Sequence, residues 1–179
     1  MSDFDDAPDA SLADEVTPDA RATLHADALD DTIDVLNPAE PVCMPGTATV
    51  AEAAQAMLAR RQAGVLVVDR EGRLQGIFTE RDVLTRVVGA GRDPARTVLA
   101  DVMTTEPEAL TPGHRVAYAL HCMSVSGYRT VPLVDDDARP IGVITVTDVV
   151  KWLASLFPEE ILNLPPGGRI KHPEKIDAG

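Results

Sequence analysis

Two short segments of the sequence carry a threonine followed three residues later by an aspartate, and this pair could bind the hydroxyls of a sugar. Thr79 precedes Asp82, and Thr145 precedes Asp148. We expect each threonine to leave the end of a strand and each aspartate to lie in the first helical turn, near amides without intrahelical partners. A carboxylate there can accept hydrogen bonds from two adjacent ribose hydroxyls, and the threonine hydroxyl can donate or accept. A helix start also favours phosphate, so the motif could bind a nucleotide.

The same spacing also describes a helix cap. A threonine before a helix accepts a hydrogen bond from a free amide of the first turn, and this role alone could explain one copy of the motif. Both roles can coexist in the same residues.

The two motifs belong to a long internal duplication. Residues 76–83 and 142–149 are 66 residues apart (142 minus 76), and the same offset relates Met57 to Met123 without any gap. A fixed long period indicates a duplicated supersecondary unit. Two copies with polar ends predict a closed pair rather than an open solenoid.

Each unit is predicted to contain a lead strand, a helix, two strands and a second helix. Thr49 and Glu52 have the spacing of a capping box, and apolar residues follow at helical intervals. The further expected elements are strands at 64–69 and 74–78 with a helix at 80–88, then a lead-in at 100–103, a helix at 114–126, strands at 130–134 and 141–145, and a helix at 146–157. The predicted fold is α/β (α+β), with two βαββα repeats packed as a pseudo-two-fold pair.

Charge is distributed unevenly along the chain. The net charge is −13, and residues 1–34 hold eleven Asp or Glu against one Arg. Because nucleic-acid affinity depends on Lys and Arg that neutralise phosphates, we expect no nucleic-acid partner. The expected organisation is an acidic disordered arm at 1–32 with a possible short helix at 19–29, repeats at 33–95 and 96–157, and a tail at 158–179 whose Ile161, Leu162 and Leu164 pack on the domain or on a neighbour.

Several classes of protein are disfavoured by the sequence. No run is apolar enough to span a membrane, and the N-terminus lacks the features of a signal peptide, so we expect a cytoplasmic location without membrane contact. Cys43 and Cys122 have no paired spacing, and His114 and His121 add no metal-ligand pattern, so no metal site is predicted. Without an activated nucleophile or a cofactor loop, we expect no enzyme.

The duplicated unit resembles a known family. A lead strand ending in Glu-Pro, a helix, two strands and a Gly-x-x-Thr-x-x-Asp helix start occur twice, as in a tandem pair of CBS domains, named after cystathionine β-synthase. The segment Asp101-Val102-Met103-Thr104 is also typical of that family. The resemblance covers about residues 33–157. It implies a sensor of an adenosine-containing ligand, such as AMP, ADP, ATP, S-adenosylmethionine or NAD, that dimerises into a flat disc.

The resemblance also implies two clefts, each shared between the repeats. The first would combine Thr79, Arg81 and Asp82 with the lead segment 108–110, including Leu110, and with Tyr128, Arg129 and Thr130. The second would combine Thr145, Thr147 and Asp148 with the lead segment 42–44, including Cys43, and with Ala63, Gly64 and Val65. Arg81 and Arg129 can pair with phosphates, whereas Thr147 and Ala63 cannot. We therefore expect the first cleft to prefer a phosphorylated ligand and the second to be weaker, more neutral or empty.

Two functions remain open from the sequence. The first is a stand-alone regulatory module that senses an adenine nucleotide, works as a homodimer and acts on an unknown effector protein. The alternative is a dimerisation or interaction scaffold whose arm or tail engages a partner. The scaffold predicts no nucleotide affinity and no effect of Asp82 or Asp148 on partner binding.

Overall fold

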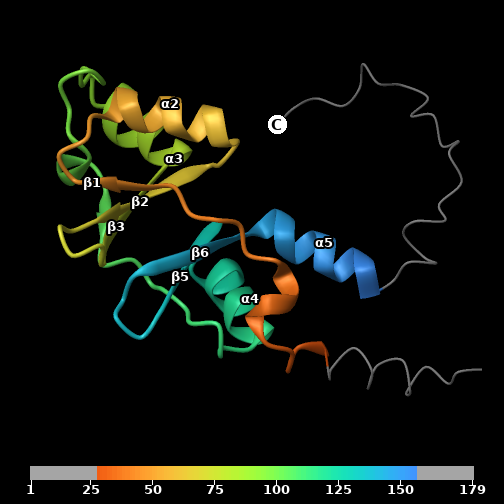
Figure 1. Ribbon diagram of the computed structural model, residues 1–179. Coiled ribbons are helices and arrows are strands. Elements are labelled where there is room, and N and C mark those ends of the chain that lie inside the picture. Colours follow the sequence, from red (N-terminus) through yellow and green to blue (C-terminus); the bar gives the residue numbers. More distant parts are fainter. Residues whose placement is uncertain (1–27, 157–179) are drawn as a thin grey trace, which may run out of the picture.

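The computed structural model describes residues 28–156, which form two small sheets with helices on their outer sides (Figure 1). In chain order the elements are the 3₁₀ helix η1 (Ile33–Leu36), strand β1 (Cys43–Pro45), helix α2 (Val50–Arg60), strands β2 (Gly64–Val68) and β3 (Leu74–Thr79), helix α3 (Glu80–Asp82), the π-helical segment η2 (Val83–Val88), the 3₁₀ helix η3 (Leu99–Asp101), strand β4 (Thr104–Thr105), helix α4 (Val116–Val125), strands β5 (Thr130–Val134) and β6 (Pro140–Thr145), and helix α5 (Val146–Leu156). The acidic arm and the tail expected from the sequence lie almost wholly outside the described residues.

The sheets repeat one hairpin in the same register. In the first sheet β1 pairs parallel with β2, β2 pairs antiparallel with β3, and β3 pairs antiparallel with β4. Gly64 lies opposite Thr79 in the β2–β3 hairpin, as Thr130 lies opposite Thr145 in the β5–β6 hairpin. Both hairpins shift register at the same place, after Val67 and after Leu133. The predicted α+β fold and its duplication are confirmed.

The helix starts show which local signals were reliable. The amide of Thr49 donates to the Glu52 carboxylate at 2.7 Å, and the Glu52 amide donates to the Thr49 hydroxyl at 3.3 Å, which confirms the capping box. The helix predicted at 114–126 begins only at Val116, because His114 closes a turn in which its Nδ1 accepts from the Thr111 amide at 2.9 Å.

The helix predicted at 80–88 is not α-helical throughout. Only Glu80–Asp82 is α-helical, and Val83–Val88 forms a π-helical turn. The Gly89 amide donates to the carbonyl of Leu84 at 2.9 Å, five residues earlier, which is the π spacing. The equivalent α5 is a regular α-helix, so the two repeats differ at this point.

The repeats exchange their N-terminal segments. Ile33 and Leu36 of η1 are buried in the core of the second repeat, whereas Leu99 and Val102 are buried in the core of the first. The sheet edges follow the same exchange, since Ala39 pairs with β6 and β4 pairs with β3. The lead-in expected at 100–103 is therefore part of η3 and the turn before β4. The N-terminal segment of each repeat thus contributes buried residues to the core of the other repeat and pairs with an edge of its sheet.

The glycine of each Thr-x-x-Asp motif provides room for this exchange. A Cβ placed on Gly76 would lie 2.5 Å from Met103 Sδ and 2.9 Å from the Thr104 carbonyl oxygen. At Gly142 the nearest atom would be Pro38 Cβ at 3.0 Å. The glycines thus allow the exchanged segment to cross close to the strand. Leu66, Ile77 and Val143 form a separate apolar cluster that joins the two sheets.

Candidate functional site

Both Thr-x-x-Asp motifs cap the helix that follows them. Asp82 Oδ2 accepts hydrogen bonds from the amide and hydroxyl of Thr79, at 2.9 and 2.7 Å. Asp148 Oδ2 accepts the same bonds from Thr145, at 2.8 and 2.7 Å. The capping interpretation of the sequence is therefore correct for both copies. It leaves Oδ1 of each aspartate for another role.

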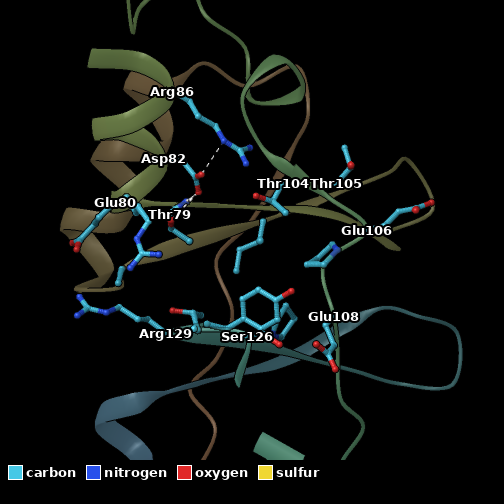
Figure 2. Close-up of a pocket in the computed structure, with 18 residues that line it drawn as sticks. Thr79, Glu80, Asp82, Arg86, Thr104, Thr105, Glu106, Glu108, Ser126 and Arg129 are labelled. Atoms are coloured by element: carbon cyan, nitrogen blue, oxygen red, sulfur yellow. Dashed lines mark hydrogen bonds and ion pairs between the residues drawn. The ribbon is translucent and has the colours of Figure 1, made fainter. Parts of the chain in front are cut away.

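A cavity of about 490 Å³ opens beside the first motif, between the two repeats (Figure 2). Three segments form most of its wall: the start of α3 in the first repeat, the linker 104–108, and residues 126–130 leading into β5 in the second repeat. The first-cleft residues predicted from the sequence that line this cavity are Thr79, Arg81, Asp82, Tyr128, Arg129 and Thr130. Leu110 does not line it, because its side chain is buried in the second core, where it bridges to Leu133.

The cavity wall carries arginines on one side, next to Glu80 and Asp82, and only carboxylates of the linker on the other. Figure 2 shows Arg129 below Thr79 and Glu80 on one side, and Glu106 and Glu108 on the other. Guanidinium groups form paired hydrogen bonds with phosphates and carboxylates, whereas carboxylates only accept. The cavity is therefore suited to a ligand with an anionic group at one end and N–H donors at the other.

Arg86 is a member of the cavity wall that the sequence analysis missed. Its Nη1 donates to the carbonyl oxygens of Val102 and Met103, at 2.9 and 2.6 Å, and its Nε lies 3.3 Å from Asp82 Oδ1 (Figure 2). The spacing of Asp82 and Arg86, four residues apart on one helical segment, could have indicated this ion pair. Its contacts with the carbonyls of residues 102 and 103, just before the linker, could not be read from the sequence. We call this arrangement the Arg86 clamp.

The residues predicted for the second cleft are more dispersed than those of the first cleft, most of which line one cavity. Thr145 and Asp148 lie at the junction of β6 and α5, Thr147 is exposed, Cys43 and Gly64 lie on β1 and β2, and Val65 is buried in the first core. Ala63 lines the 490 Å³ cavity instead. Burial raises the pKa of the Cys43 thiol, so this group stays protonated at neutral pH.

Two side chains also contact Glu40, just before the lead segment of the second cleft. Arg60 Nη2 donates to the Glu40 carboxylate at 2.7 Å, and Gln62 Nε2 donates to the Glu40 carbonyl oxygen at 2.6 Å. The residues at the matching positions of the first cleft are Ser126 and Tyr128, which line its open cavity. The two clefts thus differ in shape as well as in charge.

Other reactive groups do not assemble into a site. Cys122 is buried in the second core, and burial together with a hydrogen bond to Glu108 raises the pKa of its thiol to about 11. Within residues 28–156, no cluster of three or more His, Cys, Asp or Glu side chains could hold a metal ion. In the same part of the chain, no helix is both long and apolar enough to cross a membrane.

Comparison with known proteins identifies the family. The model of the CBS domain matches residues 33–89 and 99–155, so the chain belongs to the CBS domain family and contains two such domains. A CBS domain pair is a type of regulatory module. The resemblance noted in the sequence is therefore confirmed.

The curated relatives are mostly longer than the region they share with this chain. The meiotically up-regulated gene 70 protein of Schizosaccharomyces pombe is 44% identical over 101 residues, which is 56% of this chain and 14% of that protein. A protein of Methanopyrus kandleri, MK0525, is 30% identical over 118 residues, covering 64% of this chain and 60% of its own length.

Solved structures share the same fold. A CBS-domain protein of Agrobacterium tumefaciens, ATU1752, is 27% identical with a TM-score of 0.61, covering 68% of this chain and 98% of the other. The CBS domain pair of protein MJ0100, in complex with 5′-methylthioadenosine and S-adenosyl-L-methionine, is 21% identical with a TM-score of 0.62, covering 69% of this chain and 99% of the other.

Proposed function

We propose that this chain is a regulatory, non-catalytic module that binds an adenosine-containing nucleotide in the 490 Å³ cavity. One observation carries the proposal: the cavity brings the Thr79–Asp82 motif of the first repeat to Tyr128–Thr130 of the second, on either side of their linker. The MJ0100 domain pair, which has the same fold, holds 5′-methylthioadenosine and S-adenosyl-L-methionine. Both of those ligands contain adenosine.

The proposed binding mode follows from the positions of the polar groups. The ribose hydroxyls donate to the Asp82 carboxylate, whose Oδ2 is held by Thr79 and whose Oδ1 is paired with Arg86. An anionic group of the ligand pairs with Arg129 and Arg81. The exocyclic amino group of the base donates to a carboxylate on the opposite side, Glu106 or Glu108. A ligand held in this way contacts both repeats, fixes their relative angle and signals its presence to an effector protein.

The direct test is a titration of AMP, ADP, ATP, S-adenosylmethionine and NAD into the full chain by calorimetry, with thermal unfolding in parallel. A ligand that binds only the folded state raises the melting temperature as it saturates the site. Arg129 is exposed, so Arg129→Ala should leave the fold intact and weaken a phosphorylated ligand about tenfold or more. Arg139→Ala, a surface change outside the cavity, is the control. Absence of binding by every ligand would reject the proposal.

The two clefts can be ranked by a second pair of variants. Asp82→Ala should reduce nucleotide affinity more than Asp148→Ala, because the cavity lies beside Asp82. Each change also removes one helix cap worth about 1 kcal/mol, so the free energy of unfolding is measured for both without ligand. Equal losses of affinity at similar stability would contradict the ranking.

Exposed apolar side chains support a homodimer. Leu84 and Val88 on η2, and Val150 and Leu153 on α5, are exposed at helical spacing. Apolar surface of this kind is commonly covered by a partner, and we propose that the partner is a second copy of the chain. We also propose a cytoplasmic location for this dimer. Light scattering should give the mass of a dimer, and Leu84→Glu together with Val150→Glu should give a monomer. A dimer that binds no nucleotide would favour the interaction scaffold.

A further inference from the structure

A second cavity lies at the position that, in the other repeat, contains the Arg86 guanidinium. The three groups that hold this guanidinium are the Asp82 carboxylate and the carbonyls of Val102 and Met103. Applying the 66-residue offset, the equivalents in the second repeat are Asp148, Leu36 and Asn37. All three line a cavity of about 340 Å³ beside α5 and η1. The residues equivalent to the three that hold Arg86 therefore line open space in the second repeat, where the backbone of Asn37 is left-handed with a φ of 49°.

The cavity exists because Trp152 occupies the position equivalent to Arg86. The Trp152 side chain is only 7% exposed and packs into the second core with Ile33 and Leu36. The Arg86 side chain is 43% exposed and extends to the carbonyls of residues 102 and 103 instead. Because the Trp152 side chain turns into the core, the space next to Asp148 stays open. The Arg86 guanidinium fills the corresponding space in the first repeat. Trp152 itself forms part of the cavity wall.

The groups around the cavity are suited to a planar cation. Within residues 28–156, both hydrogen bonds to the Asp148 carboxylate go to Oδ2, so Oδ1 can accept a new donor. The indole of Trp152 provides an aromatic surface, which attracts guanidinium through its π face. Lys151 also lines the cavity and opposes a bare cation, but it is exposed and can pair with an anionic group on the same ligand.

We propose that this cavity binds a guanidinium group, held by the Asp148 carboxylate and by the backbone carbonyls of Leu36 and Asn37, as Arg86 is held by their counterparts. The ligand class is therefore a guanidinium-bearing molecule, and an arginine derivative is its simplest form. The proposal does not depend on nucleotide binding in the 490 Å³ cavity. A guanidinium fits better than an ammonium because its several N–H donors are arranged in one plane, as the three acceptors of the Arg86 clamp require.

The chain provides its own probe for this site, since Trp152 is its one tryptophan. Indole fluorescence of the full chain is followed during titration with Nα-acetyl-L-arginine, whose carboxylate can pair with Lys151, and with Nα-acetyl-L-lysine at matched ionic strength. We expect a saturable change with the arginine derivative and at least tenfold weaker binding of the lysine derivative. Arg169, beyond the described residues, could supply a guanidinium in cis, so the titration is repeated in Arg169→Gln. Saturation in either background supports the site, and no saturation in both overturns it.

Variants separate the site from general binding of cations. Asp148→Asn keeps the shape of the side chain but removes its charge, and should weaken binding of Nα-acetyl-L-arginine at least tenfold. Asp82→Asn makes the same change in the first repeat and should leave the response of Trp152 unaltered. Val35 lines the cavity and is partly exposed, so Val35→Arg should fold and should block binding by filling the site. Equal binding to all four proteins, including the wild type, would overturn the proposal.

Discussion

A single methyl group added at Gly76 should destabilise this protein more than the same change at Gly142. In Gly76→Ala the new Cβ would meet Met103 Sδ at 2.5 Å and the Thr104 carbonyl oxygen at 2.9 Å. The sulfur belongs to a flexible side chain and can move away. The oxygen belongs to the backbone of β4, whose partner is the strand that carries Gly76. Relief of this contact therefore requires β4 to shift away from β3.

The expected magnitude follows from these two contacts. Forcing an extra carbon into a packed region costs about 1–3 kcal/mol. Replacing glycine inside a strand returns about 0.5–1 kcal/mol, because glycine loses more conformational freedom on folding. The net loss at Gly76 is therefore about 0.5–2 kcal/mol, or roughly 1–8 °C in melting temperature. At Gly142 the nearest atom is the side-chain Cβ of Pro38 at 3.0 Å, so we expect a loss below about 1 kcal/mol.

Urea unfolding followed by circular dichroism would measure both differences. Gly113→Ala is the control, since a Cβ there would meet nothing within 4 Å and the backbone is not left-handed. The predicted order of stability is Gly113→Ala, then Gly142→Ala, then Gly76→Ala. If Gly76→Ala were as stable as Gly113→Ala, the motif glycine would not be explained by the close crossing of β4.

Three further changes test other contacts. Thr49→Ala should cost about 1 kcal/mol in urea unfolding by removing the capping box, whereas Thr47→Ala should be neutral. Arg86→Gln should speed hydrogen exchange at residues 102–104, because the Arg86 clamp is lost; unchanged exchange would refute that role. Burial and a neighbouring carboxylate raise the pKa of Cys122 from 9.0 to about 11, so stability should fall as pH rises through this window. Cys122→Ala should lack that fall in an alkaline unfolding series.

Local patterns predicted most of the elements and part of the cavity. The strands around Val65 and Val131 were correctly placed because their apolar runs and turns are local features, and the Thr49 capping box needs only four residues. The family resemblance predicts that Asp82 and Arg129 share a cleft, and in the structure both residues line one cavity. Which core Ile33 joins was not predictable, because an apolar residue carries no information about its distant partners.

The exchange of N-terminal segments gives the two repeats different histories during synthesis. Domains fold as the chain leaves the ribosome, beginning at the N-terminus. The first core needs Leu99 and Val102, which emerge after its own helix and strands, so it can close while the second repeat is still being made. The second core needs Ile33, which emerges before the other buried members of that cluster, and this core is complete only when Trp152 appears. The two repeats thus become complete at different times, and Ile33 is synthesised long before most of the residues that it contacts.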